Sequence, residues 1–419
     1  MISQTNKSGI TPIKKESRIQ FLDVLRGIAI LFIFIANVVY FSGYVFFPQE
    51  GLNPEATFFF DKQLDLIIHT LIDGKFYSIF SLLFGIGCVI QYTNLQKHGK
   101  PFAPFFRRRM LWLLVFGLIH LCLIWLGDIL TLYAILGFFL VWFVKLSDKK
   151  LLQFATVLIL LPVLNWLVLH FADINLRRLG AQLCGQYRMN HQLPITEYNG
   201  IAYPDFAAFI SNPNLVDFFR MNIGNTAMRI GGILSEGRIF KVFGIFLIGI
   251  WTGRQIIHSN LLENKSFLKR VAFWGIIIGL PISVFRTYLE YFAPIGDFLE
   301  LLTTIAYALG TVPLALGYAA ILALVYLKKQ RVLNAFAPVG KMALSNYIFQ
   351  TLIAITIFYG VGFGVGGKLG YTVILIITIG VFSLQLILSK WWLSNFRFGP
   401  LEWVWRQLTY GKKLKIRKG

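Results

Sequence analysis

Apolar residues occur along this chain in long runs rather than in stripes or at alternating positions. Three examples are VLRGIAILFIFIANVVYF, LLQFATVLILLPVLNWLVL and YTVILIITIGVFSLQLIL, each with at most one charged residue. A helix needs about 20 consecutive apolar residues to cross the hydrocarbon core of a bilayer. A surface helix of a soluble protein would be apolar on one face only. The pattern therefore predicts an integral membrane protein built from helices.

The apolar runs divide the chain into about ten expected spans. They cover approximately 21–43, 64–93, 110–127, 129–145, 151–171, 239–257, 271–291, 300–327, 343–363 and 369–393. We expect an all-α, polytopic transmembrane bundle with five spans in residues 1–171 and five in residues 239–419. The long connection 172–238 contains apolar and aromatic residues throughout and is expected to form a partly helical external cap.

Basic residues cluster in alternate short connections, which predicts the orientation of the bundle. The segments KHGKPFAPFFRRR, KLSDKK, ENKSFLKR and KKQR, and the tail GKKLKIRKG, all fall on one side of the expected membrane. Short loops rich in Lys and Arg stay in the cytoplasm, so both termini are predicted to be cytoplasmic. The tail segment 394–410 combines Trp and Phe with Arg, which predicts a short interfacial helix that starts near Pro400.

The net charge of +21 changes the list of expected partners. Because the basic residues lie in short segments between spans, they favour anionic lipid headgroups over nucleic acid, which we do not expect as a partner. The chain has no H-E-x-x-H, C-x-x-C, G-x-S-x-G or phosphate-loop motif. No metal site is therefore expected.

Ionisable side chains inside the spans are the first candidates for function, because each costs about 2.5–3.5 kcal/mol at the membrane centre. Asp23 and Arg26 are three residues apart on one helix face and can pair. They form either an interfacial salt bridge or an anion site in which Arg26 binds phosphate through its planar fork. Lys75, near Asp73, must find a counter-charge or snorkel out of the membrane.

His120 lies near the middle of the expected third span. It is either a hydrogen-bonding link between helices or a general base, because imidazole titrates near neutral pH. Asp128 is eight residues further on, which is about 12 Å along a straight helix. The two side chains could bond directly only if the helix broke at Gly127. The remaining candidates, for substrate binding, are Tyr133, Arg229, Arg238, Arg286, Asn346 and Gln350.

Several long segments resemble the YeiB-like family of bacterial inner-membrane proteins. They are RIQFLDVLRGIAILFIFIANVVYF, KFYSIFSLLFGIG, RRRMLWLLVFGLIHLCLIWLGDILTLYAILGF, GKMALSNYIFQTLIAITIFYGVGFG and FRFGPLEWVWRQLTYGK. The motif L-D-x-L-R-G contains Asp23 and Arg26, and H-x(6)-G-D-I-L contains His120 and Asp128. This family is distantly similar to membrane acyltransferases of the heparan-α-glucosaminide N-acetyltransferase and polysaccharide O-acetyltransferase types. The resemblance implies a bacterial plasma-membrane location, a cytoplasmic acyl donor and an acceptor modified outside.

These observations lead us to expect an integral membrane acyltransferase. Asp23 and Arg26, with Arg107 and Arg108 of the basic 97–109 segment, would bind the phosphates of an acyl-CoA. His120 would be the base, supported by Asp128, and Lys75 or Asn346 would stabilise the oxyanion. The acceptor would be a cell-envelope glycan or a lipid-linked sugar.

Two other functions remain open at this stage. A proton-coupled transporter of a small solute or lipid would use the same buried charges as a relay. The segments KFYSIFSLLFGIG and RIFKVFGIFLIGIWTG are similar, and a true inverted repeat of this kind would favour transport. A non-catalytic scaffold would only pair its buried charges with one another.

Overall fold

The computed structural model describes residues 20–47, 52–294 and 296–418. The basic residues that precede the first expected span lie outside this range. The first half contains α1 (Gln20–Phe41), η3 (Pro54–Ala56), α2 (Asp61–Leu71), α3 (Lys75–Lys97), α4 (Phe102–Ile119), η4 (His120–Ile124), α5 (Leu130–Phe143) and α6 (Asp148–Phe171).

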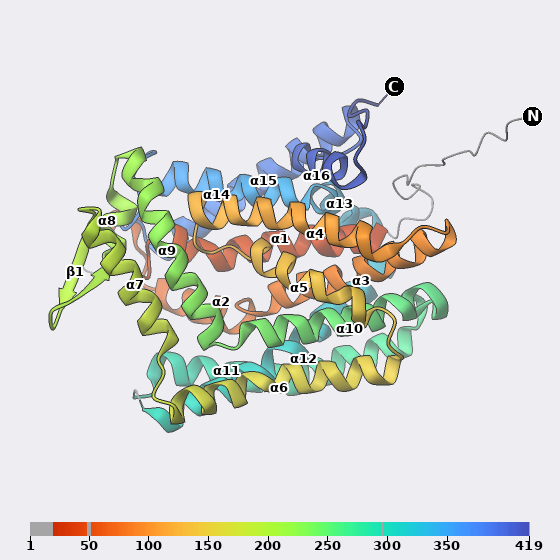
Figure 1. The fold of residues 1–419 in the computed structure, drawn as a ribbon, viewed down its shortest axis with the longest axis horizontal. Coiled ribbons are helices and arrows are strands. Elements are labelled where there is room, and N and C mark those ends of the chain that lie inside the picture. Colours follow the sequence, from red (N-terminus) through yellow and green to blue (C-terminus); the bar gives the residue numbers. More distant parts are fainter. Residues whose placement is uncertain (1–19, 48–51, 295, 419) are drawn as a thin grey trace, which may run out of the picture.

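The segment expected to form a cap is largely helical. It contains α7 (Leu176–Asn190), a hairpin of β1 (Ile195–Tyr198) and β2 (Ile201–Pro204), α8 (Phe206–Ser211) and α9 (Leu215–Ser235). The two strands are antiparallel, with Ile195 opposite Pro204. Figure 1 shows α7, the hairpin and α8 gathered at one end of the bundle, which we call the cap end.

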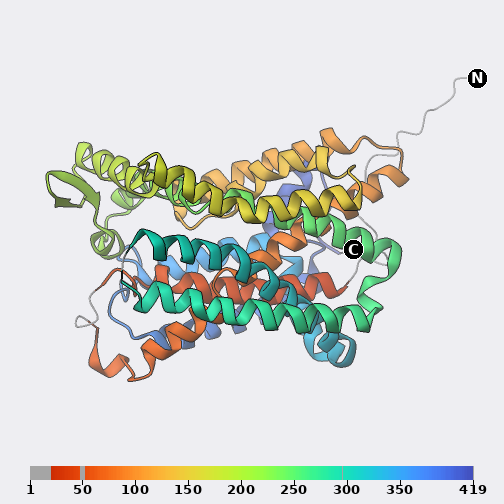
Figure 2. The ribbon, with the colours of Figure 1, turned by 90° about the horizontal axis from the view of Figure 1, so that it is seen from below.

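The second half contains α10 (Arg238–Ser259), η5 (Leu261–Glu263), α11 (Lys265–Phe292), α12 (Asp297–Leu333), η6 (Asn334–Phe336), α13 (Ala337–Lys341), α14 (Ala343–Phe358), α15 (Tyr371–Asn395) and α16 (Pro400–Tyr410). The start of α1 and the helices α13 and α16 lie at the end opposite the cap, which we call the tail end (Figure 1). Long helices run side by side between the two ends, as the view in Figure 2 also shows.

The expected all-α transmembrane bundle is confirmed. Seven helical segments of the described chain are long and apolar enough to cross a membrane, and α5 and α14 are shorter apolar helices. A count of ten spans requires α4, α5 and α14 to cross as well, so that number stays a prediction. The short helix expected near Pro400 is present as α16, which has Pro at its first turn and Gly411 in the left-handed conformation at its end. Its interfacial location stays a prediction.

Two of the expected spans are broken inside the bundle. The span expected over 64–93 is divided into α2 and α3 at Gly74, whose φ of +81° ends the regular helix. The span expected over 110–127 loses regular α geometry after Ile119, continues as the π-helical turn η4, and ends at Trp125, whose backbone is extended. Such breaks are tolerated in a membrane only where the freed backbone groups are buried in protein or line a water-filled cavity.

The similar segments at 75–87 and 238–253 pack against each other as parts of α3 and α10. A Cβ on Gly85 would collide with the backbone of Phe246 and Gly249, and one on Gly249 would collide with Leu82 and Gly85. Both helices start at the cap end, where the Arg238 guanidinium lies over the Tyr77 ring at 5.6 Å. Because they run in the same direction, these two helices are not related as an inverted repeat.

Candidate functional site

Two cavities enter the bundle from its opposite ends. The tail cavity has a volume of about 340 Å³ and lies between α1, α3, α4, α5, α13, α14 and α16. The cap cavity has a volume of about 760 Å³ and lies where α1, α2, α6 and α11 end and α3, α10 and α12 begin. Ligand pockets usually fall between about 300 and 1,000 Å³, so both are of suitable size.

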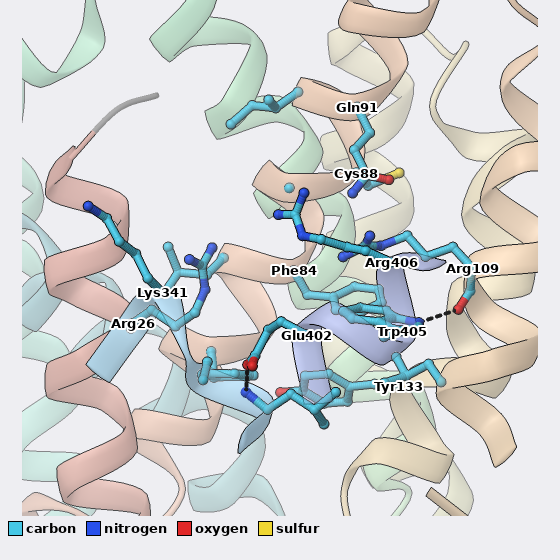
Figure 3. A pocket seen from close by; sticks show the side chains of 18 of the residues that line it. Arg26, Phe84, Cys88, Gln91, Arg109, Tyr133, Lys341, Glu402, Trp405 and Arg406 are labelled. Carbon is cyan, nitrogen blue, oxygen red and sulfur yellow. Dashed lines mark hydrogen bonds between the residues drawn. The ribbon is translucent and has the colours of Figure 1, made fainter. Parts of the chain in front are cut away.

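Charged side chains surround the tail cavity where it opens at the tail end. Its basic lining residues are Arg26, Arg109, Lys341 and Arg406, and its acidic ones are Asp23 and Glu402. Figure 3 shows Arg26 and Lys341 on one side, and Arg109, Trp405 and Arg406 on the other. The excess of basic residues suits an anionic group, and a guanidinium in particular suits phosphate or carboxylate.

The deeper part of the tail cavity is apolar. Along α3 the lining changes from Gln91 and Asn94 near the tail end to Phe80, Leu83 and Phe84 further in. Along α1 it changes in the same way, from Asp23 and Arg26 to Ile30 and Ile33. The cavity therefore has one charged end and one apolar end, which is the surface an amphiphile with an anionic head requires.

Helix α16 closes one side of the tail cavity and is tied to its neighbours by directed contacts. The Glu402 carboxylate accepts hydrogen bonds from the backbone N–H groups of Leu344 at 2.7 Å and Ser345 at 3.1 Å. It thereby caps the start of α14, whose first N–H groups have no helical partner. Burial raises the pKa of Glu402, although these hydrogen bonds act in the opposite direction.

A second contact joins α16 to α4. The Trp405 indole N–H donates to the carbonyl oxygen of Arg109 at 2.9 Å, and the Arg109 guanidinium lies 3.7 Å from the centre of the Trp405 ring (Figure 3). This cation–π contact holds Arg109 at the edge of the cavity.

The cap cavity contains a network of paired charges. His69 Nε2 lies 2.8 Å from Glu290 Oε2, and its Nδ1 lies 3.0 Å from the hydroxyl of Thr287. Arg286 pairs with Glu290 at 2.8 Å and with Asp73 at 3.2 Å. Both ring nitrogens of His69 thus have protein partners. Because both partners belong to α11, this helix fixes the orientation of the His69 ring.

Little protein separates the two cavities. Tyr133 lines the tail cavity, and Tyr77 lines the cap cavity. The Tyr133 hydroxyl donates to the carbonyl oxygen of Tyr77 at 3.0 Å and lies 2.5 Å from Ser81 Oγ. On α3, Tyr77 and the tail-cavity residue Phe80 are one helical turn apart. We call Tyr77, Ser81 and Tyr133 the septum.

The predicted donor-binding residues are only partly brought together. Asp23 and Arg26 form the expected salt bridge at 2.9 Å and line the tail cavity. Arg107 and Arg108 are exposed and do not line it. Arg107 lies over the Trp142 ring at 5.1 Å. The expectation that Arg107 and Arg108 join Arg26 is corrected, because the helix turns Arg109 towards the cavity in their place.

The predicted pair of His120 and Asp128 is formed, because the helix breaks between them. His120 Nδ1 lies 3.0 Å from Asp128, and Nε2 lies 3.1 Å from the Thr351 hydroxyl. His120 is fully buried and lines neither cavity. Its ring packs 5.2 Å from the ring of Tyr347, which is part of the tail-cavity wall. A base role for His120 stays a prediction that would require Tyr347 to move.

The other predicted residues divide between the cavities and the helix contacts. Tyr133 lines the tail cavity, while Arg238 and Arg286 line the cap cavity. Lys75 is buried and lines neither cavity, and its Nζ donates to the carbonyl oxygen of His69 at 3.4 Å.

Arg229, Asn346 and Gln350 are held in helix contacts. Arg229 donates twice to the carbonyl oxygen of Asp128, at 2.7 and 3.1 Å, and so joins α9 to the loop before α5. Asn346 bonds Ser389, and Gln350 bonds Gln385, across the α14–α15 contact.

The sequence patterns did not place Lys341, Glu402 or Arg406 in the donor site, and they included Arg109 only as part of the basic 97–109 segment. The signal for Arg109 is present in the helical period of α4. Its buried residues include Phe102, Phe106, Met110 and Leu113, and residue 109 falls beside that face. The charged residues of α13 and α16 carry no comparable local signal, because only the tertiary fold brings them to α1.

Comparisons with known proteins identify the relatives of this chain. Residues 252–412 match the family model described as "Protein of unknown function (DUF418)". The chain is 31% identical to "Uncharacterized protein YxaH" of Bacillus subtilis (strain 168), over 98% of this chain and 100% of that protein. It is 27% identical to "Uncharacterized protein YeiB" of Escherichia coli (strain K12), over 93% of this chain and 95% of that protein. No solved structure matches the chain. The full-length match to YxaH, together with the family model and the resemblance to YeiB, establishes that the chain belongs to the DUF418 family of YeiB-like membrane proteins.

Proposed function

We propose that this protein is a membrane acyltransferase whose tail cavity binds a long-chain acyl-CoA. The observation that carries the proposal is the gradient along that cavity. Arg26, Arg109, Lys341 and Arg406 lie at one end, and Phe80, Phe84 and Leu113 lie at the other. Phosphates bind the charged end, and the acyl chain lies against the apolar end.

The dimensions of the cavity support a long acyl chain. From Asn94 to Phe80 the lining follows α3 over 14 helical steps, which is roughly 21 Å of helix. The volume is about 340 Å³, so the head of the coenzyme would project from the tail end. A membrane lipid has an acyl chain like that of acyl-CoA but lacks its adenosine diphosphate group. Binding that depends on this group would therefore distinguish acyl-CoA from a lipid.

The location of the septum supports transfer towards the cap end. Because the thioester joins the coenzyme to the chain, its carbonyl would lie between the charged end and the apolar end of the tail cavity, and the acceptor would reach it from the cap cavity past Tyr133. In the transfer, an acceptor oxygen or nitrogen forms a bond to the carbonyl carbon, and the carbon–sulfur bond of the thioester breaks. The acceptor's proton ends on the released thiol of coenzyme A. We propose a cell-envelope glycan or lipid-linked sugar as acceptor.

We further propose that the tail end faces the cytoplasm in a bacterial plasma membrane. The basic connections and the tail lie at this end, as the positive-inside rule requires. A reporter fused after Gly419 should therefore read as cytoplasmic, and one inserted near Asn190 as external.

The transporter alternative receives less support from the fold. Its main argument was an inverted repeat, but α3 and α10 run in the same direction. A transporter would also move its ligand unchanged, whereas an acyltransferase releases free coenzyme A. A coupled thiol assay separates these two outcomes.

The test is binding of palmitoyl-CoA to the full-length protein in lipid nanodiscs. Arg109→Gln should weaken binding about tenfold or more, because a hydrogen bond to a charged group contributes about 1.5–3 kcal/mol. Arg107→Gln removes the same charge from an exposed site of the same helix and should change little. Gly87 lines the tail cavity, and a Cβ on it would meet nothing within 4 Å. The side chain in Gly87→Phe would therefore occupy the cavity, and this variant should not bind palmitoyl-CoA.

Two results would contradict this proposal. Equal loss of affinity in Arg107→Gln and Arg109→Gln would mean that only the general positive potential matters. Wild-type affinity in a folded Gly87→Phe protein would mean that the acyl chain lies elsewhere.

A further inference from the structure

The cap cavity has a chemistry opposite to that of the tail cavity. Its ionisable lining residues include six carboxylates, from Asp73, Asp173, Glu236, Glu290, Asp297 and Glu300, and three arginines. Each arginine is paired with a carboxylate of the same cavity. Arg177 and Arg238 bind Glu236, and Arg286 binds Asp73 and Glu290. The net balance is acidic, so an anionic ligand is disfavoured.

Uncharged donors and acceptors are interspersed with these ions. Ser235, Thr303, Thr304 and Asn175 line the cavity together with the hydroxyls of Tyr77 and Tyr307, which lie 2.5 Å apart. A hydroxyl group both donates and accepts hydrogen bonds. A ligand with many hydroxyls therefore suits a wall in which carboxylates, guanidinium groups and hydroxyls alternate.

An aromatic surface completes the lining. The rings of Trp166 and His170 are stacked with centroids 4.6 Å apart and an interplanar angle of 9°, and both residues line the cavity. The C–H face of a sugar ring can pack on such a surface while its hydroxyls meet the polar wall. The Tyr77 and Tyr307 rings already carry Arg238 and Lys241, so they are not available to a ligand cation.

We infer that the cap cavity is a sugar-binding site, selective for neutral or amino sugars against phosphorylated ones. Binding itself is independent of the tail cavity, but the role of this sugar as the acyl acceptor rests on the proposed function. The inference limits the range of possible acceptors. The acidic wall would repel a free phosphate or pyrophosphate group, so only the sugar part of a lipid-linked acceptor would enter the cap cavity.

The test uses the full-length protein in nanodiscs and saturation-transfer NMR with glucosamine, glucose and glucose 6-phosphate as probes. We expect signals from the first two sugars and at least a tenfold weaker signal from the phosphate. Trp166→Ala should remove the sugar signals. Glu300→Lys should weaken the binding signal of glucosamine and strengthen that of glucose 6-phosphate. The matched control is Glu263→Lys, which makes the same charge change at an exposed residue outside the cavity and should behave as wild type.

The variant Gly87→Phe separates this inference from the proposed function. This variant should no longer bind palmitoyl-CoA but should still give the sugar signals. If the wild type binds palmitoyl-CoA but no sugar, the inference fails and the proposed donor site stands. Equal signals from glucosamine and glucose 6-phosphate would overturn the charge argument. Loss of sugar binding in Gly87→Phe would place the sugar in the tail cavity and would also overturn the inference.

Discussion

Charged side chains in this bundle are held by particular partners rather than by general burial. Arg188 in the cap is fully buried and donates to the carbonyl oxygens of Pro194 and Asp205 and to Asn225. Lys241 donates to the carbonyl oxygen of Tyr307 at 2.7 Å. Unpaired charges in such places cost several kcal/mol, so each partner has a structural role that precedes any function.

Glu402 should make the stability of the folded protein depend on pH. Burial raises its pKa above the ordinary value of 4.5, so the folded protein holds this proton more strongly than the unfolded chain. The associated stability is fully present below pH 4.5 and is lost as the pH rises through the folded pKa. Glu402→Gln cannot titrate, so the difference in unfolding midpoint between wild type and Glu402→Gln should change with pH over this interval. A constant difference from pH 4 to pH 8 would refute the assignment.

At the scale of single residues, local spacing predicts part of the site. The Asp23–Arg26 salt bridge follows from an i, i+3 spacing on one helix. The His120–Asp128 contact required a break that helical periodicity does not predict. Lys341 and Glu402 are distant from Asp23 in sequence, and no local pattern could bring these three residues together.

At the scale of helices, small residues determine which helices can approach. Gly85 of α3 and Gly249 of α10 face each other so closely that a Cβ on either would meet backbone atoms. Close packing through small residues is a common way to join membrane helices, where apolar burial alone provides no preference for protein over lipid. The α3–α10 pair in turn carries Tyr77 and Phe80, which line different cavities.

Gly249→Ala should therefore destabilise the protein, with a cost comparable to the 1–3 kcal/mol of an overpacked core. Gly380→Ala in α15 is the matched control, because its Cβ would meet nothing within 4 Å. That change should be neutral or stabilising by up to about 1 kcal/mol. Thermal unfolding in the same detergent compares the two variants. A Gly249→Ala protein as stable as Gly380→Ala would show that α3 and α10 do not pack in this way.

The apolar runs located the helices well but not their breaks. The break after Ile119 lies in apolar sequence that favours continuous helix, and the break at Gly74 lies between Asp73 and Lys75 inside an expected span. They are stabilised by tertiary partners such as Lys75, which binds the carbonyl oxygen of His69, and Arg229, which binds that of Asp128. Arg229 is distant from Asp128 in the sequence, and Lys75 follows His69 across a turn. Hydropathy alone therefore cannot reveal the breaks.

At the scale of the whole molecule, two cavities of opposite charge approach each other from the two ends of the bundle. The basic tail cavity and the acidic cap cavity are separated by the septum of Tyr77, Ser81 and Tyr133. This arrangement is the basis for proposing a donor site at one end and an acceptor site at the other. The sequence predicted the membrane bundle and several residues of each cavity, but not their separation into two sites.

The most direct test of the central claim is to locate a bound acyl chain. The full-length protein in nanodiscs is incubated with palmitoyl-CoA that carries a diazirine near the end of its chain, irradiated, and mapped by peptide mass spectrometry. We predict cross-links on Phe84, Met110 and Leu113, which line the tail cavity, and their loss with excess unmodified palmitoyl-CoA. Cross-links confined to exposed apolar residues of the bundle surface, such as Val157 and Ile376, would contradict the account.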